Sequence, residues 1–529
     1  MKRPFRGLRH DGPRPSYDAV VIGAGVGGLV AANLLARGGL SVLLVEQHYM
    51  AGGYCSTFRR AGYTFDAATH FYPLLGNRET LTGKLLSDLG VETRWVKMDP
   101  VDTFHFPDGS RFAVPADFAS YRAALDREFP DEREALDAFF EEVDRAYLLG
   151  LLAYFRGRVT EGLERLRPLT VRQVLDRTFR SEKLKLLLTA DCPHWGSPPS
   201  RTSFVFDSML RLSYFLGNYY PVGGSQAFAD ELALRFEERG GHILMSTRAD
   251  RIEIADGAVR GVELETLRGP LAGRRRVATG AVVSNADLLQ TAERLVGADH
   301  LDPERLGEIR RLRPTFPCFL THVGLEGVPP EVLEEAQGYY WRHWNPDRVG
   351  RDGLVCKIFA PTLYEPRMAP AGGQEVILQK VLEMDYEGVA DWDAHKAAVE
   401  AEVMGHLERV IPGVGEHVVV HLSASARTAR RFTLNSAGAM LGWEMSPDQL
   451  GAGRPDQDLG VAGLVLAGHW TRPGGGITPV IISALRAAEA VLAGSRDGSR
   501  SGPEAGSEAG ERMSIPRVHS FSEVTSHGC

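Results

Sequence analysis

Three glycines near the start of the chain, Gly23, Gly25 and Gly28, constrain its fold more than any other feature. They come after a short apolar, β-branched segment over residues 18–22, which is typical of a buried parallel strand. They precede a segment rich in helix formers over residues 29–37. A strand, a turn with G-x-G-x-x-G spacing and a helix predict a nucleotide-binding β-α-β unit.

Each part of this unit has a physical role. Gly23 permits the tight turn, Gly25 lets the backbone approach a pyrophosphate, and Gly28 lets the helix pack against the strand. The unpaired N–H groups at the helix N-terminus then face the phosphates. Glu46 ends the second strand, predicted over residues 41–45, where its carboxylate accepts hydrogen bonds from a ribose. The alternative is a Rossmann-like fold that has lost its ligand.

The segment after Glu46 favours FAD over NAD. The pair Gly52 and Gly53 lets the backbone run beside an extended cofactor without side-chain clashes. A second glycine-rich signature lies in the segment 463–492, near the other end of the chain. We therefore predict that both ends of the chain close around one FAD.

These residues resemble the phytoene desaturase-like family of FAD-dependent oxidoreductases, which includes carotenoid desaturases, carotenoid isomerases and retinol saturases. The resemblance extends from Tyr17 to Leu492, and further segments that carry it lie at 62–72, 104–118, 218–232, 282–287 and 435–449. It implies an α/β fold with a Rossmann-type FAD-binding domain built from discontinuous segments. An inserted mixed α+β substrate domain with a helical lid completes the expected architecture.

The glycine signatures and the resemblance together identify a set of FAD-binding candidates: Gly23, Gly25, Gly28, Glu46, Gly52, Gly53, Ala249, Gly468, His469, Gly475, Gly476 and Ile477. Ala249 stands where the family usually has a valine whose backbone contacts the adenine. Residues 474–477 begin a helix whose N-terminus faces the flavin, which favours negative charge on the reduced ring. Two positions depart from the family: His469 replaces a common acidic residue, and Ala68 replaces a common glycine after Asp66.

Three side chains are expected nearest the flavin and are the catalytic candidates: His70, His469 and Trp470. His70 either bridges loop backbone groups or transfers a proton. His469 is expected to orient the cofactor, and Trp470 to pack against the ring. Because the cofactor carries out the difficult step, no acid–base triad is expected, and no metal site either.

The resemblance implies desaturation, saturation or flavin-assisted cis–trans isomerisation of a lipophilic isoprenoid polyene, as in carotenoid biosynthesis. Quinone or oxygen are both compatible electron acceptors. Two alternatives stay open. A prenyl-lipid carrier of the GDP-dissociation-inhibitor type would not need the late glycine signature, and an amine oxidase would use a lysine such as Lys357 or Lys380 opposite the flavin.

Composition excludes some partners. A net charge of −8 argues against nucleic acid, and five scattered cysteines without a C-x-x-C pair predict neither a disulfide framework nor a zinc site. The basic N-terminus lacks an apolar core, so we expect no secretory signal and a cytoplasmic protein. No apolar run is expected to span a bilayer, but the segments 146–155 and 203–217 are either a peripheral membrane contact or core.

The predicted organisation alternates between two domains. Residues 17–95, 217–290 and 425–494 form the FAD-binding domain, and residues 96–216 and 291–424 form the substrate domain. A flexible segment, 1–16, precedes them, and a disordered tail rich in Gly, Ser and Glu, 495–529, comes after them. Asp108-Gly109 predicts a hairpin turn, and helices are predicted at 116–129, 132–152, 225–240 and 392–410.

Overall fold

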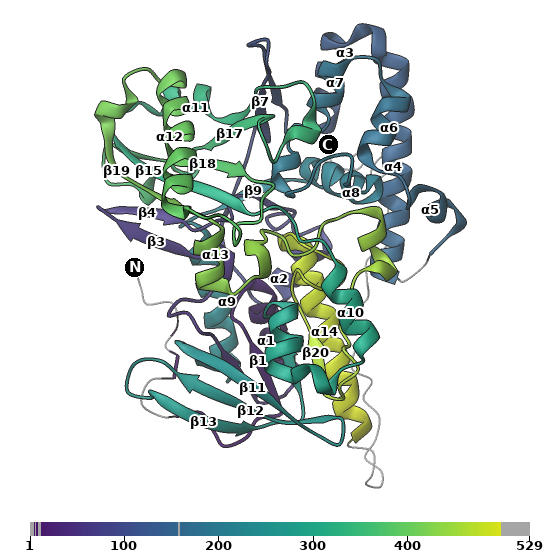
Figure 1. Cartoon of the computed structure of the whole chain (residues 1–529), viewed down its shortest axis with the longest axis vertical. Helices are drawn as coiled ribbons and strands as arrows, with labels where there is room; N and C mark the ends of the chain where they lie inside the picture. The colour runs from purple at the N-terminus through teal and green to yellow at the C-terminus, as the bar shows by residue number, and fades with distance from the viewer. Residues whose placement is uncertain (1–4, 6, 9–11, 157–158, 499–529) are drawn as a thin grey trace.

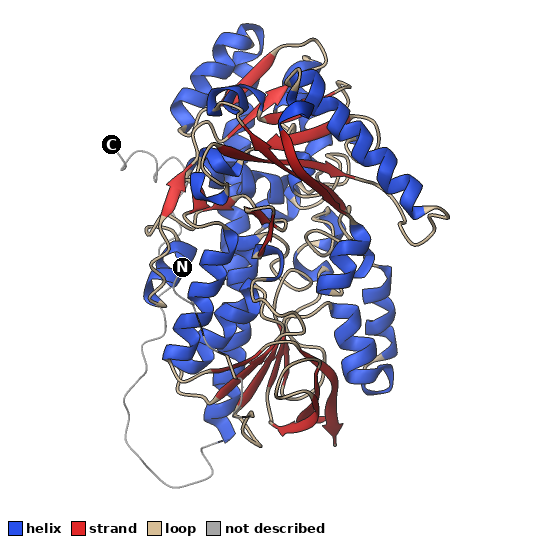
Figure 2. Cartoon of the chain, turned by 90° about the vertical axis from the view of Figure 1, so that its left-hand side faces the viewer, coloured by secondary structure: helices blue, strands red, loops and turns tan. Residues whose placement is uncertain are grey.

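A computed structural model of the chain describes residues 5, 7–8, 12–156 and 159–498. The strands gather toward the two ends of the long axis, with helices and loops between them (Figure 2). Residues 495–498 of the predicted disordered tail instead end the helix Ile477–Gly498, and the rest of the tail lies outside the described residues. Most of the N-terminal segment before Gly12 also lies outside them.

The sheet at one end is parallel and is assembled from four distant parts of the chain. Its strands, in order across the sheet, are β10 (His242–Leu244), β2 (Val42–Val45), β1 (Ala19–Ile22), β14 (Val282–Ser284) and β20 (Leu464–Leu466). All four residues of β1 and of β2 are buried, as their continuous apolar sequences predict. Because parallel strands place their carboxyl ends at one edge, the loops after β1, β14 and β20 come together there.

Three helices pack beside this sheet: α1 (Val26–Arg37), α9 (Ser225–Glu238) and α14 (Ile477–Gly498). α1 lies between the other two and packs against both (Figure 1). A smaller antiparallel sheet stands beside them, made of β11 (Thr247–Ala255), β12 (Ala258–Thr266) and β13 (Gly273–Ala278). The whole arrangement is the predicted Rossmann-type α/β fold.

At the other end lies a seven-stranded sheet, with the order β19 (Val418–Ala424), β15 (Cys318–Glu326), β18 (Gly373–Val381), β17 (Leu354–Phe359), β16 (Gly338–Trp341), β7 (Asp102–His105) and β8 (Arg111–Val114). Neighbouring strands are antiparallel except for β16 and β7. The turn at Asp108-Gly109 joins β7 to β8, as predicted. Two remote segments of the chain therefore share this sheet.

Helices cover the sides of the seven-stranded sheet (Figure 1). One group is α3 (Phe118–Glu128), α4 (Arg133–Arg156), α5 (Glu161–Leu166), α6 (Val171–Thr178), α7 (Glu182–Leu187) and α8 (Phe204–Phe215). A second group is α11 (Pro330–Ala336), α12 (Trp392–Val410) and α13 (Ala426–Thr433), while α2 (Leu81–Asp88) and α10 (Pro303–Arg311) lie lower. The four predicted helices are confirmed within a few residues at their ends.

Short strands connect the two ends of the molecule. β3 (Thr57–Arg60) pairs with β4 (Tyr63–Asp66), and β9 (Asn218–Pro221) lies between β5 (Tyr72–Pro73) and β6 (Trp95–Lys97). The segment after β4 therefore leaves the Rossmann part and passes directly beneath the seven-stranded sheet, where His322 of β15 donates to the backbone oxygen of Asp66 at 2.8 Å.

The prediction that no apolar segment is long enough to span a bilayer needs correction. Within the described residues, the segment Ile477–Ser495 of α14 is apolar and long enough to cross a membrane by length and composition. Its apolar face packs on α1, with Ile481, Ala484, Ala487 and Ala488 buried. The helix is apolar because it is a core helix of the Rossmann part.

Candidate active site

A cavity of about 1270 Å³ lies between the parallel sheet and the seven-stranded sheet. Both glycine signatures line it. The predicted cofactor residues on its wall are Gly23, Gly25, Glu46, Gly52, Gly53, Ala249, Gly468, His469, Gly475, Gly476 and Ile477. Gly28 is not on the wall: a Cβ there would collide with the carbonyl oxygen of Gly23, so this glycine lets α1 pack against the turn.

The N-terminus of α1 opens into the cavity. Gly25 is its N-cap and offers no side chain to satisfy the first N–H groups of the helix. Gly52 lies against this turn, because its N–H donates to the carbonyl oxygen of Ala24 at 2.8 Å. Gly53 comes next at φ +59°, and a Cβ there would lie 3.3 Å from the Cα of Gly25. The result is a side-chain-free cradle of backbone N–H groups, which suits an anion.

Glu46 is held at the edge of this cradle by backbone donors. One carboxylate oxygen accepts from the N–H of Ala24 at 2.7 Å, and the other accepts from the N–H of His48 at 2.8 Å. Burial raises the pKa of the Glu46 carboxyl, while these N–H groups lower it. The remaining lone pairs of each oxygen can accept further hydrogen bonds from sugar hydroxyls.

Asn285 lies where the two signatures meet, although the sequence pattern did not single it out within the segment 282–287. It comes directly after β14, the strand between β1 and β20. A Cβ on Gly25 would lie 3.1 Å from its Nδ2, and a Cβ on Gly468 would lie 2.7 Å from its Oδ1. Its place at the carboxyl end of a parallel strand is a signal that could have identified it, once the strand order was known.

The C-terminal signature is anchored by a buried arginine that the sequence pattern also did not reveal. Arg454, 1% exposed, donates to the backbone oxygens of Trp443, Glu444, Gln449 and His469. It thereby joins the loop after β20 to the segment 443–449. Gly475 allows the loop after β20 to lie close to the backbone of Leu441, because a Cβ there would collide with the carbonyl oxygen of Leu441.

At the opposite end of the cavity, Ala249 lies on the wall beside a bulge in β11. Its carbonyl oxygen accepts from Arg294 at 3.0 Å. Its contact with an adenine stays a prediction.

Two of the three catalytic candidates line the cavity. His70 and His469 do so, and burial is the main cause that lowers the pKa of each imidazole to about 3. Both are therefore neutral at physiological pH, which disfavours a role as proton donor. His70 also makes the loop-bridging contact expected of it, since its Nδ1 lies 3.0 Å from the carbonyl oxygen of Ala68.

Trp470 lies behind the wall. It is 3% exposed and is not among the residues that line the cavity. Its indole N–H donates to the side-chain oxygen of Asn435 at 3.1 Å, and its ring meets that of Trp443 edge-on. Contrary to the expected contact with a flavin ring, the structure gives Trp470 a packing position next to the site.

Beyond the glycine signatures the cavity continues into an apolar arm between the two domains. We define this arm by the residues Tyr147, Leu151, His194, Trp195, Phe206, Met209, Leu210, Ser213, Leu216, Cys318, Leu320, Gln379, Met440, Leu441 and Met445. None of them is an acidic residue, a lysine or an arginine. The two segments considered as membrane contacts lie in and around α4 and α8 and supply much of the arm. Contact of these segments with a membrane stays a prediction.

Neither lysine named for the amine oxidase alternative lines the cavity. Lys357, 2% exposed, donates to Asp102 at 2.6 Å and stands 4.4 Å from the ring centroid of Tyr339. Lys380 donates to the backbone oxygens of Leu354 and Val355 at 3.0 and 3.1 Å. Both ammonium groups therefore form hydrogen bonds to residues of the seven-stranded sheet.

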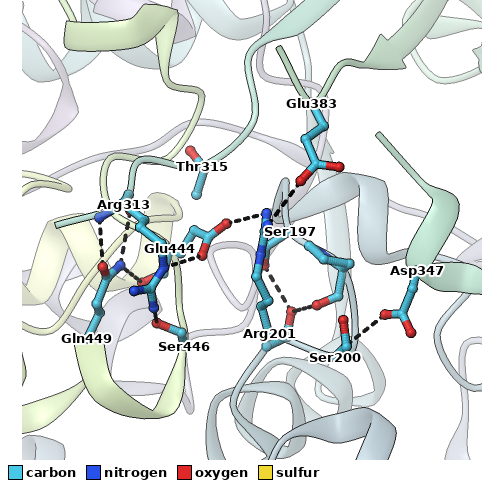
Figure 3. A network of polar contacts seen from close by, with 12 residues as sticks. Ser197, Ser200, Arg201, Arg313, Thr315, Asp347, Glu383, Glu444, Ser446 and Gln449 are labelled. Atoms are coloured by element: carbon cyan, nitrogen blue, oxygen red, sulfur yellow. Dashed lines mark hydrogen bonds and ion pairs between the residues drawn. The ribbon is translucent and has the colours of Figure 1, made fainter. Parts of the chain in front are cut away.

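A polar network fixes one wall of the arm (Figure 3). Glu444, 2% exposed, lies between Arg201 at 2.7 Å and Arg313 at 3.3 Å. Arg201 also pairs with Glu383, and Arg313 with Asp448. The neighbouring backbone contact from Ser203 N–H to the Met445 oxygen, at 2.8 Å, belongs to the same junction. The network therefore holds the segment with Met440, Leu441 and Met445 against α8.

The chain matches the family model for flavin containing amine oxidoreductases over residues 26–492. It belongs to this family. The match includes most of the chain, with Gly28 and the whole C-terminal glycine signature, while Gly23 and Gly25 come just before it. Together with the cavity that both signatures line, the match makes the protein an FAD-dependent oxidoreductase.

Curated relatives are similar to the chain at low identity. Prolycopene isomerase 1 of an Oncidium hybrid cultivar is 26% identical, over 90% of this chain and 84% of the relative. The neurosporene-forming phytoene desaturase of Rhodobacter capsulatus is 25% identical, over 89% and 93%. All-trans-retinol 13,14-reductase of Danio rerio is 27% identical, over 61% and 56%.

The fold is also found in solved structures. Putrescine oxidase bound to putrescine superposes with a TM-score of 0.64, at 15% identity, over 92% of this chain and all of the oxidase chain. At this identity the likeness concerns the fold.

Proposed function

We propose that this flavoenzyme acts on a lipophilic isoprenoid polyene by desaturation, saturation or cis–trans isomerisation. One observation carries the proposal: a single cavity is lined both by the two glycine signatures and by the predominantly apolar side chains that define the arm. A long apolar molecule gains free energy in such an arm in proportion to the area that it removes from water. The named relatives act on carotenoids and a retinoid, which supports the same substrate class.

The residues that line the cavity fit FAD. The backbone cradle at Gly23 and Gly25 would hold the pyrophosphate, Glu46 would accept from the ribose, and the start of α14 at Gly476 and Ile477 would face the flavin. Bound FAD supplies two-electron chemistry, with quinone or oxygen as acceptor when the polyene is oxidised.

The protein itself contributes alignment and exclusion of water. The arm aligns the polyene along α4 and α8, with Tyr147, Phe206 and Met209 on its wall. His70 and His469 stay neutral beside the reacting end, because burial lowers the pKa of each to about 3. Neither imidazole is therefore a charged proton donor to the substrate at neutral pH.

An amine oxidase is disfavoured by the same wall. In that alternative a lysine is expected to face the ring, and a carboxylate would pair with the ammonium group of the substrate. The arm has no carboxylate, and Lys357 and Lys380 are bonded elsewhere.

The test is anaerobic incubation of the purified, FAD-loaded protein with a panel of carotenoids and retinoids. Bleaching of the oxidised flavin with a more conjugated product would show desaturation. Reoxidation of the reduced flavin with a less conjugated product would show saturation, and a changed double-bond geometry without net oxidation would show isomerisation. No polyene product, together with turnover of a primary amine, would contradict the proposal.

A further inference from the structure

Three of the polar side chains on the cavity wall have ring or amide atoms without a partner among the described residues. They are His70, in the loop between β4 and β5, His194, in the short turn Cys192–His194, and Gln379 of β18. All three line the cavity, and they come from three remote parts of the chain. We call them the polar belt.

His70 presents an unsatisfied acceptor. Its Nδ1 lies 3.0 Å from the carbonyl oxygen of Ala68, and because a carbonyl only accepts, this nitrogen carries the hydrogen. Burial lowers the pKa of the ring to about 3, so at neutral pH Nε2 is a bare lone pair. Among the described residues, nothing donates to this buried nitrogen. A buried acceptor left unpaired costs about 1–3 kcal/mol.

The other two members also have unpaired atoms. The Oε1 of Gln379 is buried and accepts no hydrogen bond from any described residue, while the amide group contacts the sulfur of Met440 at 3.9 Å and the thiol of Cys318. The ring of His194 lies 6.2 Å from that of His70 and 4.4 Å from that of Phe71, and no described residue hydrogen-bonds its nitrogens. With two unpaired acceptors fixed, the belt calls for a ligand that brings a hydrogen-bond donor.

The surroundings decide what kind of donor fits. A hydrocarbon polyene has none. An ammonium group would bring charge next to Lys357, whose positive charge adds to burial in lowering the pKa of both imidazoles. The belt therefore suits a neutral O–H group.

We infer that the substrate is a polyene alcohol, whose hydroxyl donates to the polar belt while its chain fills the apolar arm. This inference rests on the proposed function and makes it narrower. It makes His70 and Gln379 specificity-determining residues for an oxygen function on the substrate.

The experiment compares matched ligands on the FAD-loaded protein. All-trans-retinol is paired with the same hydrocarbon lacking the hydroxyl, and a dihydroxy carotene with its parent carotene. Binding is followed by quenching of tryptophan fluorescence, without turnover. In the wild type we expect each alcohol to bind about tenfold more tightly than its hydrocarbon partner, equivalent to about 1.4 kcal/mol.

Two substitutions at His70 separate its nitrogens. His70→Asn keeps an amide donor near the Nδ1 position and removes Nε2, so the preference for the alcohol should fall to within about twofold. His70→Gln places an amide near the Nε2 position and should restore part of the preference. Gln379→Leu tests the second acceptor independently. Met209→Leu changes the apolar wall that contacts both ligands, so it should alter the binding of alcohol and hydrocarbon alike and leave their ratio unchanged. Flavin absorbance and thermal unfolding check that each variant is folded.

Equal binding of alcohol and hydrocarbon by the wild type would overturn the inference and leave the polyene function standing. A preference that survives both His70→Asn and Gln379→Leu would also overturn it. Tighter binding of retinylamine than of retinol would overturn the requirement for a neutral donor. If none of the polyenes binds, the proposed function fails, and the inference fails with it.

Discussion

Gly25 and Gly476 line the same cavity, although they come from opposite ends of the chain. Gly25 comes after β1 and Gly476 after β20, and only β14 lies between these strands in the parallel sheet. The two signatures therefore meet at the carboxyl edge of one sheet, where the side chain of Asn285 lies between them. This is the position at which open α/β sheets bind their ligands.

Gly25→Val should abolish FAD binding. The branched side chain would enter the cradle at the N-terminus of α1 and press on Asn285, 3.1 Å from the first added carbon. We expect the dissociation constant for FAD to rise by at least about a hundredfold, or about 2.7 kcal/mol, and the purified protein to be colourless. Gly280→Val is the matched control, because nothing lies within 4 Å of a Cβ there. Fully yellow Gly25→Val protein would refute the assigned phosphate site.

Lys357→Met should lower the free energy of unfolding, because Lys357 has a structural role in an ion pair with Asp102. The substitution leaves Asp102 buried without its ammonium partner, which typically costs about 3–5 kcal/mol. Adding Asp102→Leu should recover much of this loss, since a buried pair replaced by apolar groups is often neutral. Chemical denaturation of both variants measures the difference. Lys84→Met, at an exposed pair with Asp88, is expected to cost less than about 1 kcal/mol.

Glu444→Gln should loosen the wall of the arm. It removes the buried charge that Arg201 and Arg313 share, and we expect a loss of about 2 kcal/mol in the free energy of unfolding. Binding of a polyene should weaken as well, because Met445 lies on the adjoining wall. Asp448→Asn, at the more exposed end of the network, should change stability by less than about 1 kcal/mol. Equal losses in the two variants would contradict the role given to the buried carboxylate.

Stability should fall as the pH drops below about 6.5, partly because of His322. Burial lowers the pKa of this imidazole from 6.5 to about 4, so between these values the unfolded chain binds a proton that the folded protein does not. The free energy of unfolding therefore decreases on acidification through this window, by roughly 3 kcal/mol for this residue. Denaturation of wild type and His322→Gln from pH 7 to pH 4 measures the contribution of His322 as the difference between the two curves.

Protonation of Asp66 changes the free energy of unfolding in the opposite direction. The comparison therefore uses two proteins that both contain Asp66. Burial raises the pKa of its carboxyl to about 6, although the hydrogen bonds donated by Tyr220 and Ser225 lower it. The folded protein gains a proton there as the pH falls, which stabilises it. If His322→Gln showed the same pH dependence as the wild type, the assignment of His322 would be wrong.

Local structure could be predicted from neighbouring residues. The spacing of Gly23, Gly25 and Gly28 predicted the β-α-β unit, and Pro412 marked the end of the helix predicted over residues 392–410, which the structure shows as Trp392–Val410. In the structure, the side chain of Asp391 caps this helix by accepting from the N–H of Ala394. Such features depend on contacts within a few residues, which the order of amino acids determines directly.

The sequence by itself determined the nucleotide-binding signatures and the alternation of strand and helix, because these depend on backbone freedom and short-range periodicity. Only the tertiary structure decided which side chains face the cavity. It paired Lys357 with Asp102, placed Trp470 behind the wall and put His70, His194 and Gln379 on the wall of one cavity. The physical reason is that these neighbours are set by strand order and by packing between remote segments, which no local pattern encodes.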